Sequence, residues 1–180
     1  MKRIFLINLL NDYLTLNKEE KECRERMLQF IEENEDCFER SLEKGHITAS
    51  AWLLNREGTQ ALLMHHAKLG VWCQLGGHCD GDSDPLRVAL KEASEESGIQ
   101  AIIPIKKGIF DIDIHLIPEY KGIKAHYHYD VRFILQVVSN EEIKINHEAK
   151  DLRWIGKRRD LLPTDALSVT RMFDKWIGEK

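Results

Sequence analysis

Apolar and polar residues follow two different periods along this 180-residue chain. Residues 3–15 and 18–34 carry apolar side chains every three or four positions, which predicts two amphipathic helices. Asn17 followed by Glu20 is typical of a capping box at the start of the second helix. The apolar faces of both helices need a surface to cover them, either the rest of the chain or a second subunit in a homodimer.

From about residue 46 the pattern changes to that of strands. ITASAWLLN (47–55) and QALLMHH (60–66) are separated by the turn-like REGT, which predicts a hairpin. Strands dominate the middle of the chain and helices flank it, so a mixed α/β sandwich is expected. The other predicted elements are strands at about 101–116, 124–138 and 151–156, and helices at 85–97 and about 164–178.

The helix at 85–97 has clear boundary signals. Asp84 is a good N-cap residue, and Pro85 suits the first helical position. Gly98 is typical of the residue that ends a helix in the left-handed conformation. We therefore expect this helix to begin and end at these residues.

Composition and charge exclude several classes of protein. Apolar residues make up 43% of the chain, enough for a hydrophobic core. The formal net charge of −4 gives no overall basic surface, so no nucleic-acid partner is expected. The N-terminal apolar run IFLINLL is short and is followed by Asn11 and Asp12, so neither a signal peptide nor membrane association is expected.

The four cysteines, Cys23, Cys37, Cys73 and Cys79, match no common disulfide framework. We expect them to be reduced thiols in a cytoplasmic protein. Cys73 and Cys79 flank a glycine pair, with His78 between them. A zinc site there is an alternative interpretation, although no second CxxC or HxxxH motif accompanies it.

Three glutamates lie close together on the predicted 85–97 helix. Glu92, Glu95 and Glu96 have the spacing i, i+3 and i+4, which places them on one face within about one turn. Like charges at this spacing repel one another. Hard divalent cations such as Mg²⁺ prefer oxygen ligands and would offset that repulsion. The alternative is a solvated acidic face with Lys91 as its ion-pair partner.

The string GGHCDGDSDPLRVALKEASEESGI, residues 76–99, resembles the Nudix box, G-x5-E-x7-R-E-U-x-E-E-x-G-U, where U is a bulky aliphatic residue. Counted from Gly77, the spacing matches from Glu92 through Ile99. The chain departs from the box at three positions: Ser83 replaces its first glutamate, Lys91 its arginine and Ala93 a larger aliphatic residue.

The resemblance implies a Nudix-type α/β/α sandwich with a mixed β-sheet over residues 46–180. The helices of residues 1–45 lie outside the resemblance and are expected to form an N-terminal helical extension. The family's activity implies a metal-dependent hydrolase that cleaves a phosphoanhydride in a nucleoside diphosphate linked to another moiety. Its partner would be a small nucleotide-type molecule.

By matching positions, the resemblance implies that Glu92, Glu95 and Glu96 hold Mg²⁺ or Mn²⁺, with the carbonyl of Gly76 as a further ligand. Glu95 and Glu96 are also the expected catalytic residues. The glycine pair allows the backbone to approach this place without a side-chain clash.

A further glutamate is implied by a pattern seen in some family members, in which a glutamate lies six residues before a tryptophan that opens the last strand. The string HEAKDLRW places Glu148 six residues before Trp154. Glu148 is therefore a candidate fourth metal ligand or the general base. An ordinary surface glutamate is the alternative.

Two other stretches, FDIDIHLIPEY and KAHYHYDVRF, place polar residues at alternate positions, which share a face in an extended strand. If the two strands pair, the polar rows meet and could form a substrate-contacting wall or a second metal site. The alternative is the solvent-facing half of an amphipathic hairpin. The rows are Asp111, Asp113 and His115 in the first stretch, and His126, His128 and Asp130 in the second. We predict substrate contacts from His115, His126, His128 and Asp130.

Trp72 lies just before the box in the loop KLGVWCQLGG, with His65, His66 and Lys68 nearby. This setting predicts that Trp72 stacks on a substrate base, and a buried tryptophan is the alternative. Loops here could also bind phosphate through Lys68.

Two rival functions remain open. Ser83 and Lys91 are consistent with a Nudix fold that binds a nucleotide or metabolite without hydrolysing it. An isoprenyl diphosphate isomerase on the same fold would need a cysteine near the reacting carbon, and Cys73 or Cys79 is available for that role.

Overall fold

The N-terminal segment forms two helices that pack on the rest of the chain. The computed structural model describes residues 2–120 and 122–178, and in it α1 spans Ile4–Asp12 and α2 spans Lys18–Glu33. Asn17 caps α2, since its side chain accepts the Glu20 N–H at 3.1 Å. The apolar faces of both helices belong to the same buried cluster as the sheet; their fully buried residues are Leu6, Leu10, Met27 and Ile31.

The rest of the chain therefore covers the apolar faces of the two N-terminal helices. Phe30 of α2 stacks on Tyr129 of the sheet, with ring centroids 3.8 Å apart. A homodimer formed through these helices stays a prediction, and the large apolar side chains exposed in this segment are Ile4, Phe5, Leu14 and Leu16.

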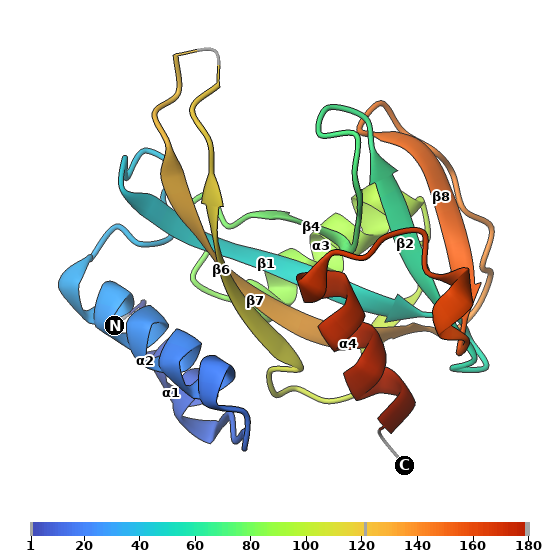
Figure 1. Cartoon of the computed structure of the whole chain (residues 1–180), viewed down its shortest axis with the longest axis horizontal. Helices are drawn as coiled ribbons and strands as arrows, with labels where there is room; N and C mark the ends of the chain where they lie inside the picture. The colour runs from blue at the N-terminus through green and yellow to red at the C-terminus, as the bar shows by residue number, and fades with distance from the viewer. Residues whose placement is uncertain (1, 121, 179–180) are drawn as a thin grey trace.

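Eight strands form one mixed, curled sheet around β1, which spans Gly45–Leu54 (Figure 1). β1 pairs in parallel with β7 (His126–Val137) and antiparallel with β2 (Gln60–His66) and β4 (Leu75–His78). The remaining strands extend the sheet on either side: β3 (Trp72–Cys73) and β8 (Ala149–Gly156) pair with β2, and β5 (Ile102–Pro104) and β6 (Asp111–Ile117) pair with β7.

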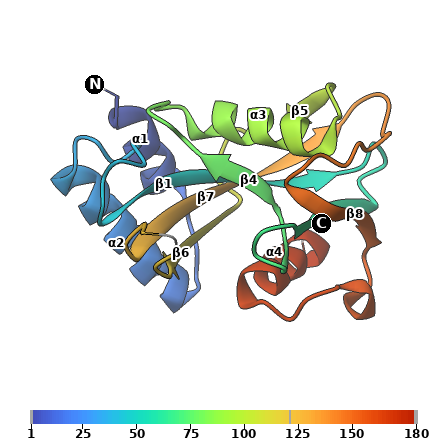
Figure 2. The ribbon, with the colours of Figure 1, turned by 90° about the horizontal axis from the view of Figure 1, so that it is seen from above.

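Two further helices cover opposite faces of the sheet. Seen from above, α3 (Pro85–Ser97) lies over one face and α4 (Leu167–Gly178) over the other (Figure 2). α3 shares the large buried cluster with α1 and α2, whereas α4 packs on a separate cluster around Trp52. A short 3₁₀ turn, Arg159–Leu161, precedes α4. The expected mixed α/β sandwich with N-terminal helices is confirmed.

The two faces of β1 differ in chemistry because its side chains alternate in direction. Ile47, Ala49 and Ala51 are fully buried in the cluster beneath α3. Thr48 and Ser50, at the intervening positions, are buried on the other face and donate hydrogen bonds to Asp130 of β7. A polar row therefore runs along the middle of the sheet.

The predicted strand at 101–116 is wrong in one respect, because it forms two strands. The Ile105 N–H bonds to the Ile134 carbonyl, and the Phe110 N–H bonds to the Arg132 carbonyl. Residues 106–109, between these two positions, leave the ladder as a short loop that separates β5 from β6. The loop predicted at 68–77 likewise contains the short strands β3 and β4.

Candidate active site

The register of the sheet brings the two predicted polar rows together. His115 of β6 lies directly opposite His128 of β7, and Asp113 lies opposite Asp130. His128 in turn lies opposite His46 of β1. Since directly paired residues share a face, β6, β7 and β1 form one continuous polar wall. The condition under which the two polar rows meet, that these strands pair, therefore holds.

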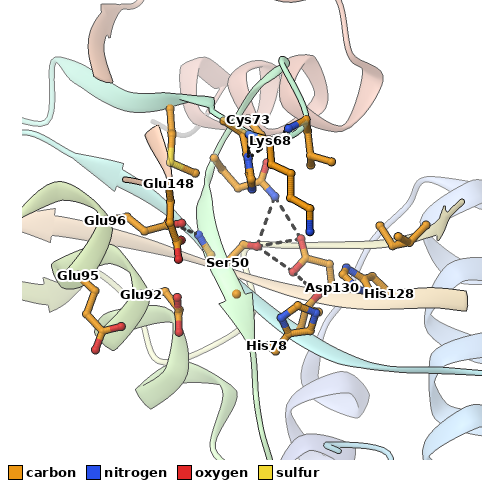
Figure 3. A pocket seen from close by; sticks show the side chains of 18 of the residues that line it. Ser50, Lys68, Cys73, His78, Glu92, Glu95, Glu96, His128, Asp130 and Glu148 are labelled. Carbon is orange, nitrogen blue, oxygen red and sulfur yellow. Dashed lines mark hydrogen bonds between the residues drawn. The ribbon is translucent and has the colours of Figure 1, made fainter. Parts of the chain in front are cut away.

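This wall borders a cavity of about 700 Å³. Figure 3 shows the glutamates of α3 and Glu148 on one side of the cavity, and Asp130, His78 and His128 on the other. Gly76 and His115 also line it, so most of the predicted site residues meet in one place. Trp72 and His126 are outside the lining.

Glu96 is the most deeply buried of the glutamates, with 3% of its surface exposed. Its Oε2 accepts the Gly76 N–H at 2.8 Å, which fixes the carboxylate against β4. Burial, together with the charges of Glu92, Glu148 and Glu95, raises the pKa of Glu96 to about 8. A carboxylate placed so close to others is stabilised in its charged form when a cation joins them.

Glu92 and Glu95 share one partner, Lys91, whose Nζ lies 3.0 Å and 3.4 Å from their oxygens. Burial raises the pKa of Glu92. Glu148 lies immediately before β8, about half exposed, and its own N–H bonds to the Asn146 side chain at 2.9 Å. These carboxylates come from a helix and a loop far apart in the sequence, yet they line the same cavity.

The Gly77 backbone passes directly beside Glu92. A Cβ atom at position 77 would lie 2.6 Å from Glu92 Oε2, which is too close for a real contact. Because Gly77 has no side chain, the Glu92 carboxylate can lie directly beside the backbone of β4.

We predict that Gly77→Ala keeps the fold but displaces the Glu92 carboxylate, since the end of a flexible side chain can shift. Mn²⁺ affinity, measured by titration calorimetry, is expected to fall roughly 10- to 100-fold. Gly108→Ala is the matched control because its Cβ would meet nothing within 4 Å. Equal Mn²⁺ affinity in the two variants would contradict the placement of Glu92 in the metal site.

Ser83, which replaces the first glutamate of the box, has a neighbour that ties the loop to the helix. The Asp82 carboxylate accepts the Arg87 Nε–H at 2.8 Å and the Asp84 N–H at 2.9 Å. Asp84 caps α3 by accepting the Arg87 N–H at 3.2 Å. Asp82 and Arg87 thus hold the loop against the first turn of α3.

Asp130 is held at the cavity wall by four side chains. Its oxygens accept hydrogen bonds from Thr48 at 2.9 Å, Ser50 at 2.8 Å, Gln74 at 3.2 Å and the Arg132 Nε–H at 2.7 Å. Figure 3 shows Ser50 beside Asp130. Asp130 has only 2% of its surface exposed, so its carboxylate contacts these side chains and almost no solvent. Its contribution is to order the wall on which His128 lies.

The remaining predicted contacts differ in their access to the cavity. His115 Nδ1 lies 3.2 Å from Asp113 Oδ2, and its ring faces His128 with centroids 5.4 Å apart. His126 Nδ1 lies 2.8 Å from the Lys124 carbonyl oxygen. Trp72 stacks on His65, with centroids 5.1 Å apart, and packs on the α4 cluster, where it is partly buried.

Sequence reasoning missed His46 as a site residue and treated His78 only with the cysteines. His46 is 3% exposed, and burial lowers its pKa to about 4. Burial and neighbouring histidines lower the pKa of His128 to about 2. The alternation His46, Thr48, Ser50 along β1 is the signal that would have identified this polar row.

The two cysteines offered for isomerase or zinc chemistry are separated by the structure. Cys73 lines the cavity, and burial raises the pKa of its thiol to about 12. Cys79 is buried in the cluster beneath α3. All four cysteines are free thiols.

A family model described as the NUDIX domain matches residues 44–171. The chain therefore belongs to the NUDIX family, as the box residues and the sandwich fold indicate. No curated protein matches the chain. Within residues 2–120 and 122–178, no helix is both long and apolar enough to cross a membrane.

Solved structures with the same fold include several hydrolases. A MutT protein from Methanosarcina mazei Go1 is 20% identical, with a TM-score of 0.59 over 76% of this chain and 95% of that one. A C. elegans Ap4A hydrolase is 16% identical, with a TM-score of 0.58 over 73% and 94%. An E. coli dihydroneopterin triphosphate pyrophosphohydrolase is 12% identical, with a TM-score of 0.54 over 73% and 94%. At these identities the likeness is one of fold.

Proposed function

We propose that this chain is a metal-dependent hydrolase that cleaves a phosphoanhydride in a nucleoside diphosphate linked to another moiety. The observation that carries the proposal is that Glu92, Glu95, Glu96 and Glu148 line one cavity. Those carboxylates, with the Gly76 carbonyl, would hold Mg²⁺ or Mn²⁺, because hard cations prefer oxygen ligands. Family membership and neighbours named as hydrolases of phosphate compounds support the substrate class.

Two observations indicate that these carboxylate and carbonyl oxygens suit a divalent cation. The pKa of Glu96 is raised by burial and by surrounding carboxylates, so negative charge is in excess there. The cavity is also large enough for a phosphate group to complete the coordination shell, which Mg²⁺ sites commonly require. When bound, the ion would neutralise phosphate oxygens and acidify the attacking water.

The chain's own residues would then perform three tasks. Glu96, fixed by the Gly76 N–H, orients the carboxylate cluster. Glu148, on the more exposed loop before β8, accepts the proton of the attacking water on a carboxylate oxygen. The wall of His115 and His128 contacts the substrate on the other side of the cavity. Trp72 and His126 would need side-chain rotation to join them.

We propose a cytoplasmic location as well, supported by the four free thiols in the described structure, which suit a reducing compartment.

The test is a panel of nucleoside diphosphate derivatives incubated with Mg²⁺ or Mn²⁺, with phosphate and nucleotide release as the measurements. Release that requires metal and is abolished by a chelator supports the hydrolase. Thermal stabilisation by a panel member without any release would favour a non-catalytic binding module. Allylic product from labelled isopentenyl diphosphate would instead favour the isomerase.

A further inference from the structure

Three histidines form a compact group across the cavity from the glutamates, and the proposed hydrolysis does not use them as a group. His78 and His128 line the cavity, whereas His46 is buried beside them and does not line it. His46 comes from β1, His78 from β4 and His128 from β7. Their ring centroids form a nearly equilateral triangle, with separations of 5.0, 4.9 and 5.0 Å. One ring nitrogen from each lies within 4.8 Å of the other two.

The group contains buried nitrogens without partners. His46 is 3% exposed, and within the described residues neither of its ring nitrogens has a hydrogen-bond partner. The same holds for Nε2 of His128. An unpaired buried polar group lowers the stability of the fold, so native structures rarely leave one without a partner. A ligand that accepts lone pairs from several imidazoles would satisfy these atoms together.

The strands hold the three rings in place. His46 and His128 are direct partners in the parallel ladder, and His78 is paired with Thr48, two positions along the same face. Nitrogens around a tetrahedral Zn²⁺ lie about 3.3 Å apart, given bonds of about 2.0–2.1 Å. The three ring nitrogens now lie within 4.8 Å of one another. Rotation of the imidazole side chains would bring them to the spacing around Zn²⁺ without a change in strand pairing.

The surroundings also suit a cation. The guanidinium of Arg40, which lines the same cavity, is held in a two-pronged ion pair by Asp80, which offsets its charge. His126 lies 5.1 Å from His46 and 5.2 Å from His128, measured between ring centroids. Its Nδ1 lies 2.8 Å from the Lys124 carbonyl oxygen, so His126 borders the group of three without belonging to it.

We propose that His46, His78 and His128 form a second metal site, separate from the carboxylates and selective for a nitrogen-preferring ion of the Zn²⁺ type. Imidazole suits Zn²⁺ and its neighbours in the first transition row, whereas Mg²⁺ prefers oxygen. The cavity would then hold a hard ion on one side and a softer ion on the other. The proposal stands independently of hydrolysis at the glutamates, because its readout is metal binding alone.

The test uses the full chain without a histidine tag, stripped of metal by a chelator. Co²⁺ is titrated in excess Mg²⁺, and visible absorption reports nitrogen coordination. One equivalent of Co²⁺ with a visible spectrum, displaced by Zn²⁺, is expected for the wild type. The signal should be lost in His128→Ala and in His78→Ala, a half-buried position where the fold has less to lose. It should persist in His147→Ala, whose side chain is 88% exposed, and in Glu96→Gln.

Three results would overturn the proposal. The first is no stoichiometric Co²⁺ or Zn²⁺ binding to the wild type. The second is a spectrum that survives both histidine substitutions while circular dichroism shows native folds. The third is a spectrum lost in Glu96→Gln but retained in the histidine variants, which would place the ion among the carboxylates.

Discussion

Replacing Glu96 with glutamine is expected to lower metal-dependent turnover by about 100-fold or more. The carboxylate is buried at the cavity wall and fixed by the Gly76 N–H at 2.8 Å. Glutamine has nearly the same shape, and its Oε1 can accept the same hydrogen bond. It carries no charge, so it cannot help to neutralise a divalent cation. The measurement is kcat/KM with Mg²⁺ or Mn²⁺ on a panel member that the wild type hydrolyses.

This substitution separates the site from the fold. Burial raises the pKa of Glu96 to about 8, so without metal the folded protein favours the neutral carboxyl near pH 7. A neutral glutamine should therefore leave the melting temperature without metal unchanged or higher. Glu95→Gln should also lose turnover, whereas Glu25→Gln, on an exposed position of α2, should behave as wild type. Full turnover in Glu96→Gln would exclude the proposed role of this carboxylate.

The part of the site carried by α3 could be predicted from the sequence because its determinants are local. The N-cap Asp84, the Pro85 start and the Gly98 end all occur at the expected residues, with Gly98 at φ 76°. The spacing of Glu92 and Glu96 then fixes their common face within one helix. No information from distant segments is needed for such an arrangement.

The functional consequence of Ser83 could not be predicted in the same way. Ser83 replaces the first glutamate of the box, yet Asp82 and Arg87 connect the loop to α3 through a hydrogen-bonded ion pair. Which side chains meet in a loop depends on backbone turns, and the spacing of charges alone does not determine these. Asp82 and Asp84 flank Ser83 in the chain, and they make different bonds: Asp82 accepts the Arg87 Nε–H, and Asp84 accepts the Arg87 backbone N–H.

The histidine group required the topology of the sheet. His128 was part of a recognised alternating row, but its neighbours His46 and His78 come from strands distant in sequence. The alternation of His46 with Thr48 and Ser50 marks a polar row on β1, but it does not say which strands lie beside that row. Only the parallel pairing of β1 with β7 places His46 beside His128.

Replacing Arg132 with methionine is expected to destabilise the protein by about 3–5 kcal/mol, because it removes one partner of a buried charge network. Arg132 is 1% exposed and contacts three carboxylates. Its distances are 2.7 Å to Asp130, 2.9 Å to Asp111 and 3.3 Å to Asp113. Methionine fills a similar volume, so the loss comes from charge and not from a cavity.

The rest of this network cannot replace the lost guanidinium. Arg171 and Lys175 reach Asp111, and Lys175 also bonds Glu20 of α2, which ties α4 to the N-terminal helices. Burial alone would raise the pKa of Asp111, but Arg171, Arg132 and Lys175 hold it below its ordinary value. Asp130 would keep only neutral donors among the side chains that hydrogen-bond it in the described structure. Its carboxylate would then be buried without a compensating charge.

Urea unfolding measures this effect through the midpoint, with an unchanged slope showing that the native surface is retained. Arg158→Met is the matched control, since its ion pair with Asp160 is exposed on both sides and such pairs contribute little. The same shift in both variants would mean that the buried network adds nothing beyond a surface pair. A shift confined to Arg132→Met would show that the wall carrying His128 depends on the charge balance beneath it.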